Sequence, residues 1–125
     1  MNPSTSILMD IREAVGLSKE DPNFDKELTM HINAALGTLN QNGVGKFLIV
    51  IDKTPTWDDF KDPTQIGGNE YYQLVPLYVA LSTKLLFDPP PPSSVEYHSK
   101  SAKELLWRLK VAYETKTVIE EVILE

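Results

Sequence analysis

Cysteine is absent from this chain of 125 residues. Its absence excludes disulfides, thiolate nucleophiles and thiolate metal ligands, and it leaves the redox compartment undetermined. Positive charge is also scarce, because 12 basic residues face 18 acidic ones and give a formal net charge of −6. That balance argues against a nucleic-acid grip by the whole surface, which depends on Lys and Arg displacing counterions, although a local basic patch stays compatible with it.

Long apolar runs are missing as well. None approaches the ~20 residues needed to cross a bilayer, and the segment Met1–Thr5 lacks the basic region of a secretory signal. We therefore expect no membrane contact and a protein made and used in a cytosol. The hydrophobic share of 42% and the charged share of 24% are ordinary for one globular domain of this length.

The sequence does not match the usual patterns of a catalytic, metal or phosphate-binding site. His31 and His98 lie far apart, and neither has a second ligand four residues on. Asp58 and Asp59 are adjacent and so point to different sides of a helix. The run Gly43–Lys46 lacks the Ser or Thr of a phosphate loop and follows a helix instead of opening one. We predict no catalytic residue, no cofactor and no metal site.

Apolar residues recur at helical spacing in four segments, which predicts an all-α, small four-helix domain. The predicted helices are Ser6–Val15, Asn23–Asn40, Asn69–Phe87 and Ser94–Tyr113. Pro76 predicts a kink in the third helix unless that helix begins only at the proline. Trp107 borders the apolar stripe of the fourth helix, so we expect it in the core or at its edge.

Residues 44–68 form a long irregular excursion from this pattern. Within it, Phe47–Ile51 is apolar and β-favouring, which predicts a short strand or hairpin whose unpaired edge suits contact between subunits. Thr56–Phe60 has the pattern of a capped helical start, with an acidic residue three positions after the threonine. Trp57 and Phe60 suit either an interface centre or a cover for the core, and the residues alone do not choose between these.

We divide the chain into a helical domain, residues 1–113, and a C-terminal tail, residues 114–125. The tail pattern fits a helix, while its β-branched content fits an added strand, and it is a candidate assembly arm. The predicted subunit or partner interface comprises the apolar residues of the excursion and the tail, namely Phe47, Ile49, Ile51, Trp57, Phe60, Val118, Val122 and Leu124.

Four consecutive prolines, Pro89–Pro92, end the third helix abruptly. Because proline fixes φ and lacks an amide hydrogen, the run predicts a stiff elbow, after which Ser93 or Ser94 caps the next helix. A rigid corner of this kind suits a scaffold better than a catalyst.

Three blocks carry a resemblance to a known family. They are Ile32–Asn33 through Leu39 to Gly43–Gly45, then Thr56–Phe60, then Leu85–Pro90 followed by Trp107–Leu109. In this order and spacing, from about Ser6 to Tyr113, the chain resembles the head-tail connector, or head completion, proteins of long-tailed bacteriophages and prophages. This chain departs from the family pattern at two places. It has Pro76 where relatives usually carry a residue that continues the helix, and it has four prolines after Asp88 where two are usual.

This resemblance implies a structural protein of the virion, at the head-tail interface, assembled in the bacterial host cytoplasm. It implies a homo-oligomeric ring, typically of twelve subunits, that binds the portal protein and a downstream head-tail joining or tail protein. DNA would pass through its lumen without sequence-specific binding. The alternative is a prophage-encoded helical module that binds another protein without forming a ring.

Overall fold

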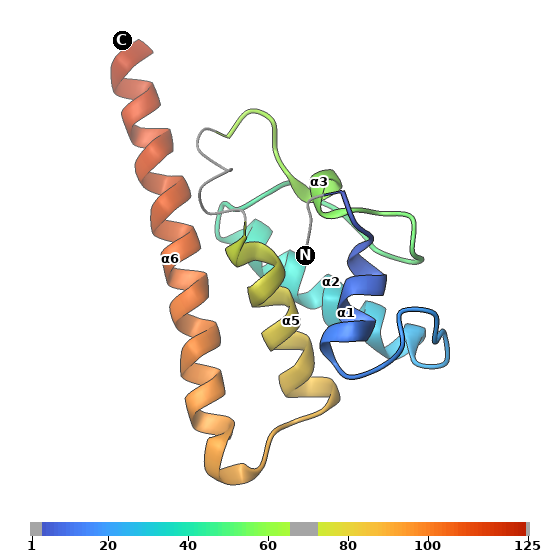
Figure 1. Ribbon diagram of the computed structural model, residues 1–125. Helices are drawn as coiled ribbons and strands as arrows, with labels where there is room; N and C mark the ends of the chain where they lie inside the picture. The colour runs from blue at the N-terminus through green and yellow to red at the C-terminus, as the bar shows by residue number, and fades with distance from the viewer. Residues whose placement is uncertain (1–3, 66–72, 125) are drawn as a thin grey trace.

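The computed structural model describes residues 4–65 and 73–124, with residues 114–124 described by their backbone alone. These residues form five helices and confirm the all-α prediction: α1 (Ile7–Ala14), α2 (Asp25–Gln41), α3 (Trp57–Phe60), α5 (Leu74–Phe87) and α6 (Pro92–Leu124). Helix α5 lies in the middle and packs against α1, α2 and α6 (Figure 1). Helix α6 is the longest and extends past the rest of the chain (Figure 1).

Helix α1 begins and ends where its sequence predicts. The Ser6 hydroxyl accepts a hydrogen bond from the Met9 amide at 3.3 Å, which satisfies one of the free amides of the first turn. Gly16 has a φ of +90°, and the Leu17 amide donates to the Arg12 carbonyl at 2.9 Å. This left-handed stop turns the chain toward α2.

The long second helix, α2, confirms the clearest periodicity in the sequence. Its buried face consists of Leu28, Ile32, Ala35, Leu36 and Leu39. The helix ends at Gln41, Asn42 is its C-cap residue, and Gly43 follows with a φ of +82°. Helix α2 therefore supplies one continuous wall of the core.

The described part of α5 begins at Leu74, so residues 69–72 of the predicted helix lie outside the described residues. Pro76 is the third residue of this helix. Its missing amide hydrogen costs nothing there, because the first amides of a helix have no partner within it. Of the two alternatives from sequence, the structure supports a proline near the helix start over a kink.

The proline elbow is present, although the next helix starts earlier than predicted. Helix α6 begins at Pro92, a residue whose fixed φ suits the first helical position. The predicted serine cap is wrong, since the Ser94 hydroxyl donates to the Pro91 carbonyl at 3.1 Å instead of accepting from an amide. Across the elbow, the rings of Phe24 and Phe87 meet edge to face at 5.5 Å between centroids and tie it to the start of α2.

Helix α6 runs through position 113 without interruption and reaches Leu124. The tail is therefore helical, one of the two alternatives that its sequence left open. Trp107 is 63% exposed, so its predicted place in or beside the core is wrong. At 100° per residue, Trp107 lies on the side of α6 opposite to Ala102 and Leu109, which face the body and are buried.

Candidate interaction surfaces

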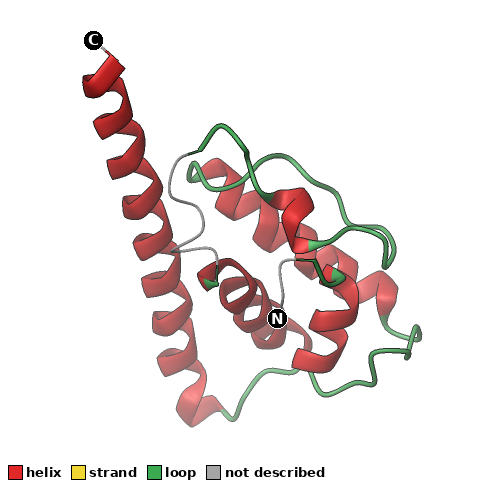
Figure 2. Cartoon of the chain, turned by 45° about the horizontal axis from the view of Figure 1, so that its top comes forward, coloured by secondary structure: helices red, strands yellow, loops and turns green. Residues whose placement is uncertain are grey.

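The excursion is an irregular loop, and the strand prediction for Phe47–Ile51 is wrong. The described residues contain only an isolated bridge between Ser6 and Thr56 (Figure 2). At Val50 a side chain replaces the missing strand partner: the Asn33 amide group donates to the Val50 carbonyl at 2.9 Å and accepts from the Val50 amide at 2.8 Å. Both backbone groups are satisfied without a second strand.

The first turn of the excursion is fixed equally closely. The Gln65 side chain accepts from the Gly45 amide at 3.1 Å and donates to the Gly43 carbonyl at 2.6 Å. Gly45 has a φ of +70°, and a Cβ there would lie 2.3 Å from the ring of Phe60. Only glycine fits this close approach of backbone to ring.

Helix α3 attaches the excursion to the hydrophobic core through its buried side chains. The predicted capping box is confirmed, with the Thr56 amide donating to the Asp59 carboxylate at 2.8 Å. Trp57 is fully buried, and its indole Nε1 donates to the Asp10 carboxylate of α1 at 2.8 Å. Phe60 is buried as well. The structure thus takes the core alternative for both aromatics, and neither is accessible to a partner, which removes them from the predicted interface.

The other three predicted residues of the excursion point outward. Phe47 and Ile51 are each 78% exposed and Ile49 is 48% exposed, while Val50 is buried between them. Exposed and buried residues thus alternate around Val50 although no strand forms, and the two hydrogen bonds to Asn33 hold the backbone at Val50. Val118, Val122 and Leu124 lie on the α6 backbone, and their side chains are outside the described residues.

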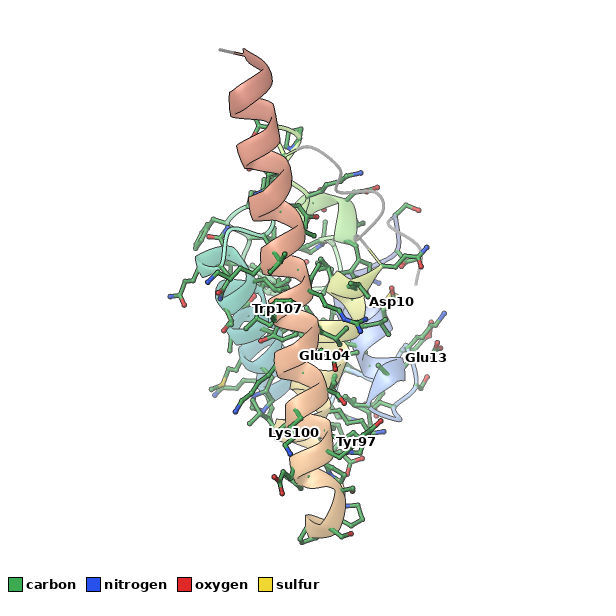
Figure 3. All side chains as sticks on the ribbon, turned by 90° about the vertical axis from the view of Figure 1, so that its left-hand side faces the viewer. Asp10, Glu13, Tyr97, Lys100, Glu104 and Trp107 are labelled. Atoms are coloured by element: carbon green, nitrogen blue, oxygen red, sulfur yellow. The ribbon has the colours of Figure 1, made fainter. Side chains whose placement is uncertain are left out.

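A second exposed surface, which the sequence reasoning missed, runs along α6. We call it the outer stripe; it consists of Tyr97, Lys100, Glu104, Trp107 and Val111. Figure 3 looks onto this side of α6 and shows four of these residues along the helix. The signal was in the sequence, because their spacings of three and four residues place them on one helix face. That periodicity was hidden by the stronger apolar stripe on the opposite side.

A third feature is an open hollow of about 420 Å³ beside α1. We call it the α1 hollow; it is lined by Met9, Arg12, Lys19, Glu20, Pro22, Asp25, Ile51, Asp52 and Lys53. Its wall is rigid on one side, since the buried Arg12 guanidinium contacts both oxygens of Asp25, at 2.9 and 2.6 Å. This hydrogen bonding, together with nearby carboxylates, raises the pKa of Arg12 above its ordinary value.

The Arg12 guanidinium therefore makes its hydrogen bonds within the chain. It also donates to the Lys19 carbonyl at 2.6 Å, so these hydrogen bonds join α1 to the turn that follows it and to the start of α2. Within residues 4–65 and 73–124, no group of three or more His, Cys, Asp or Glu side chains is placed to hold a metal ion. No helix in the same residues has the length and apolar character to span a membrane.

The features that stand out within residues 4–65 and 73–124 are thus the exposed apolar residues of the excursion, the outer stripe of α6 and an open hollow lined mostly by charged side chains. A family model described as phage connector protein matches residues 7–116. The chain belongs to this family. The match confirms the resemblance seen in the sequence blocks, and connector proteins have a structural role in the phage, not an enzymatic one. No curated protein and no solved structure matches the chain.

Proposed function

We propose that this phage connector protein is a subunit of a ring, typically of twelve copies, that joins the portal at the capsid vertex to the tail and lets DNA pass through its lumen. The family match over residues 7–116 carries the proposal. Its partners are further copies of itself, the portal protein and a downstream head-tail joining or tail protein. It acts in the virion, at the head-tail interface, after assembly in the bacterial host cytoplasm.

The exposed part of the excursion supports an assembly role. Phe47, Ile49 and Ile51 hold large apolar surfaces in water on a loop whose backbone is fixed by Asn33 and Gln65. Because the loop is already ordered, little conformational entropy is lost when a partner covers it. These three residues stay our candidates for a subunit or partner contact, and the helical segment 114–124 stays a candidate assembly arm.

The charge of the chain supports a passage for DNA in place of a binding site. A net charge of −6 leaves carboxylates in excess, and a lumen lined by them repels phosphates and keeps DNA from adhering as it moves. Mapping the surface charge of the assembled ring tests this part. A strongly basic lumen would contradict it.

The decisive experiment is co-expression of this chain with the portal protein of the same phage, followed by electron microscopy of the purified particles. We expect an added ring on one end of the portal particle. In a phage lacking the gene, we expect filled heads without tails, restored by a plasmid copy. Binding to another protein without a ring would favour the helical binding module instead, and tailed, infectious particles without the gene would overturn the connector role.

A further inference from the structure

The outer stripe of α6 is open along its length. Tyr97 and Trp107 are 71% and 63% exposed, and in Figure 3 the other helices lie behind α6. Large aromatic residues are the side chains most enriched at the energetic centres of protein interfaces. Within the described part of the chain, nothing stands between this side of α6 and a partner helix.

The same side of the helix continues past the body. Helix α6 runs unbroken from Pro92 to Leu124, so its register places Val118 within about 20° of Trp107 around the helix axis. Val111 lies between them, four residues after Trp107 and seven before Val118. We call Trp107, Val111 and Val118 the α6 seam, and spacings of this kind are typical of helices that pair along their length.

Charge is divided along α6. Residues 92–113 carry four Lys or Arg and two Glu, all of them exposed, which is an excess of two positive charges. Residues 114–124 carry three Glu and one Lys, an excess of two negative charges. The two parts of one helix are therefore opposite in sign. An antiparallel neighbour of the same sequence brings unlike parts together, whereas a parallel neighbour brings like parts together.

Lys103 and Lys110 are the basic residues of the first part that have no acidic partner there. The other charged residues of that part are paired within the helix, at 2.9 Å for Arg108 with Glu104 and at 3.4 Å for Lys100 with Glu96. Among the described side chains, Lys103 and Lys110 form no such ion pair. They are seven residues apart, which places both on one flank of the α6 seam.

Glu114 and Glu121 occupy the same flank in the second part of the helix. Each follows one of the two lysines by eleven residues, which is about 20° more than three full turns. Two antiparallel helices related by a two-fold axis meet with the same flank of each copy side by side. Lys103 then lies opposite Glu121 of the second copy, and Lys110 lies opposite Glu114. Both pairs are centred on residue 112, so one register satisfies both.

In this register the α6 seam meets its own copy. Val111 lies beside the two-fold axis and so next to Val111 of the second copy, while Trp107 lies at the level of Val118. Parallel pairing instead sets Lys103 beside Lys103 and Glu121 beside Glu121, which repel. The charges therefore favour a second copy of this chain in the antiparallel orientation.

We propose that two copies of this chain form a closed pair in solution, antiparallel along the outer sides of α6. Trp107 is the anchor of the contact, and four lysine–glutamate pairs, two from each end of the overlap, set its register. A two-fold contact closes after two copies, so the pair goes beyond the proposed ring and does not depend on it.

The absence of cysteine makes the register measurable. Val111→Cys puts a thiol beside the two-fold axis, and we expect it to give a disulfide-linked dimer on mild oxidation in solution, without the portal. Ser93→Cys is the matched control, because Ser93 is exposed and lies five full turns before Val111 on the same side of α6. In the antiparallel pair its two copies are roughly 57 Å apart along the helix axis, so we expect no linked dimer.

Charge reversal tests what sets the orientation. In the Val111→Cys chain, Lys103→Glu with Lys110→Glu is expected to lower the linked dimer about tenfold or more, because all four facing pairs become like charges. Glu114→Lys with Glu121→Lys is expected to do the same. Mixing the two reversed chains restores a linked dimer between them, since each then faces the opposite sign.

Two further variants separate the contact from folding and from net charge. Trp107→Ala is expected to lower the linked dimer about tenfold or more, as loss of an interface anchor does. Its melting temperature stays at that of the parent, because an exposed side chain contributes little to folding. Lys26→Glu with Lys53→Glu changes the net charge equally at exposed positions outside α6 and leaves the linked dimer unchanged.

Three results would overturn the pair. They are a Ser93→Cys dimer as abundant as the Val111→Cys dimer, a Val111→Cys dimer insensitive to both charge reversals, and no Val111→Cys dimer at any concentration. A ring on the portal without the Val111→Cys dimer removes only the pair and leaves the connector role standing. The dimer in solution without a ring on the portal supports the pair and counts against the connector role.

Discussion

The excursion and helix α6 both present apolar residues to solvent, yet they are held in opposite ways. The loop has no strand partner, so some of its backbone groups are bonded by side chains, by Asn33 of α2 at Val50 and by Gln65 of the excursion itself at Gly45. Helix α6 satisfies its own backbone and needs the body only along the face of Ala102 and Leu109. The exposed apolar residues of the excursion therefore lie on a loop that side-chain hydrogen bonds hold in place. Those of α6 lie on a helix that is held by its own backbone hydrogen bonds.

The two regions also differ in how their buried and exposed residues are arranged. In the excursion the residues that hold the fold, such as Trp57 and Val50, alternate with residues that face outward, such as Ile49 and Ile51. In α6 the buried and the exposed residues lie on opposite sides of one helix, so the outer stripe can change without disturbing the core. Substitutions in the loop are expected to affect folding, and substitutions on the stripe are not.

The largest effect is expected at Trp57. Trp57→Ala removes a fully buried indole and its bond to Asp10, which lowers the free energy of unfolding by about 3–5 kcal/mol in chemical denaturation. Trp57→Phe keeps most of the volume and isolates the loss of the hydrogen bond. The comparison with α6 breaks if Trp57→Ala costs no more than Trp107→Ala, since that would mean that α3 is not anchored in the core.

A smaller effect is expected at Asn33. Asn33→Ala leaves the Val50 amide and carbonyl without their partners and costs about 1–3 kcal/mol, with faster hydrogen exchange at the Val50 amide. Gln41→Ala, at an exposed position of the same helix, is the control and leaves that exchange rate unchanged. Asn33→Asp keeps the acceptor for the Val50 amide and is expected to protect it in part. Equal exchange in all three variants would show that the loop is held by other contacts.

Local signals in the sequence were sufficient for most of the fold. The cap at Ser6, the left-handed Gly16 and the capping box at Thr56–Asp59 all depend on residues a few positions apart, and each is present. The strand prediction at Phe47–Ile51 failed for a different reason. Whether an extended run becomes a strand depends on the partner that its backbone finds, and here that partner is a side chain 17 residues away.

The candidate surfaces could be predicted only in part. The outward alternation of Phe47, Ile49 and Ile51 follows from period two and holds in the structure. The outer stripe is equally visible at period three and four, but the prediction for Trp107 follows from the apolar stripe that it borders in sequence and not from its angle on the helix. The α1 hollow could not be predicted, because α1, the turn after it and the distant loop meet only in the folded chain.

The smallest effect concerns Tyr113, the last described side chain on the face of α6 that meets the body. Burial raises its pKa above the ordinary value of 10.0, because the phenolate loses hydration there. The unfolded chain therefore releases this proton at lower pH than the folded one. The stability that the neutral phenol contributes is fully present below pH 10.0 and is lost as the pH rises through the raised pKa.

Denaturation measured across the alkaline range, with tyrosinate absorbance recorded alongside, tests this directly. Tyr113→Phe is expected to remove part of the decline in stability at high pH, whereas Tyr97→Phe, at an exposed position of the outer stripe, controls for loss of a hydroxyl in solvent. The result also shows how far along α6 the body holds the helix. If Tyr113→Phe leaves the alkaline decline unchanged, contact with the body ends before Tyr113, and more of α6 is available for assembly than the buried face indicates.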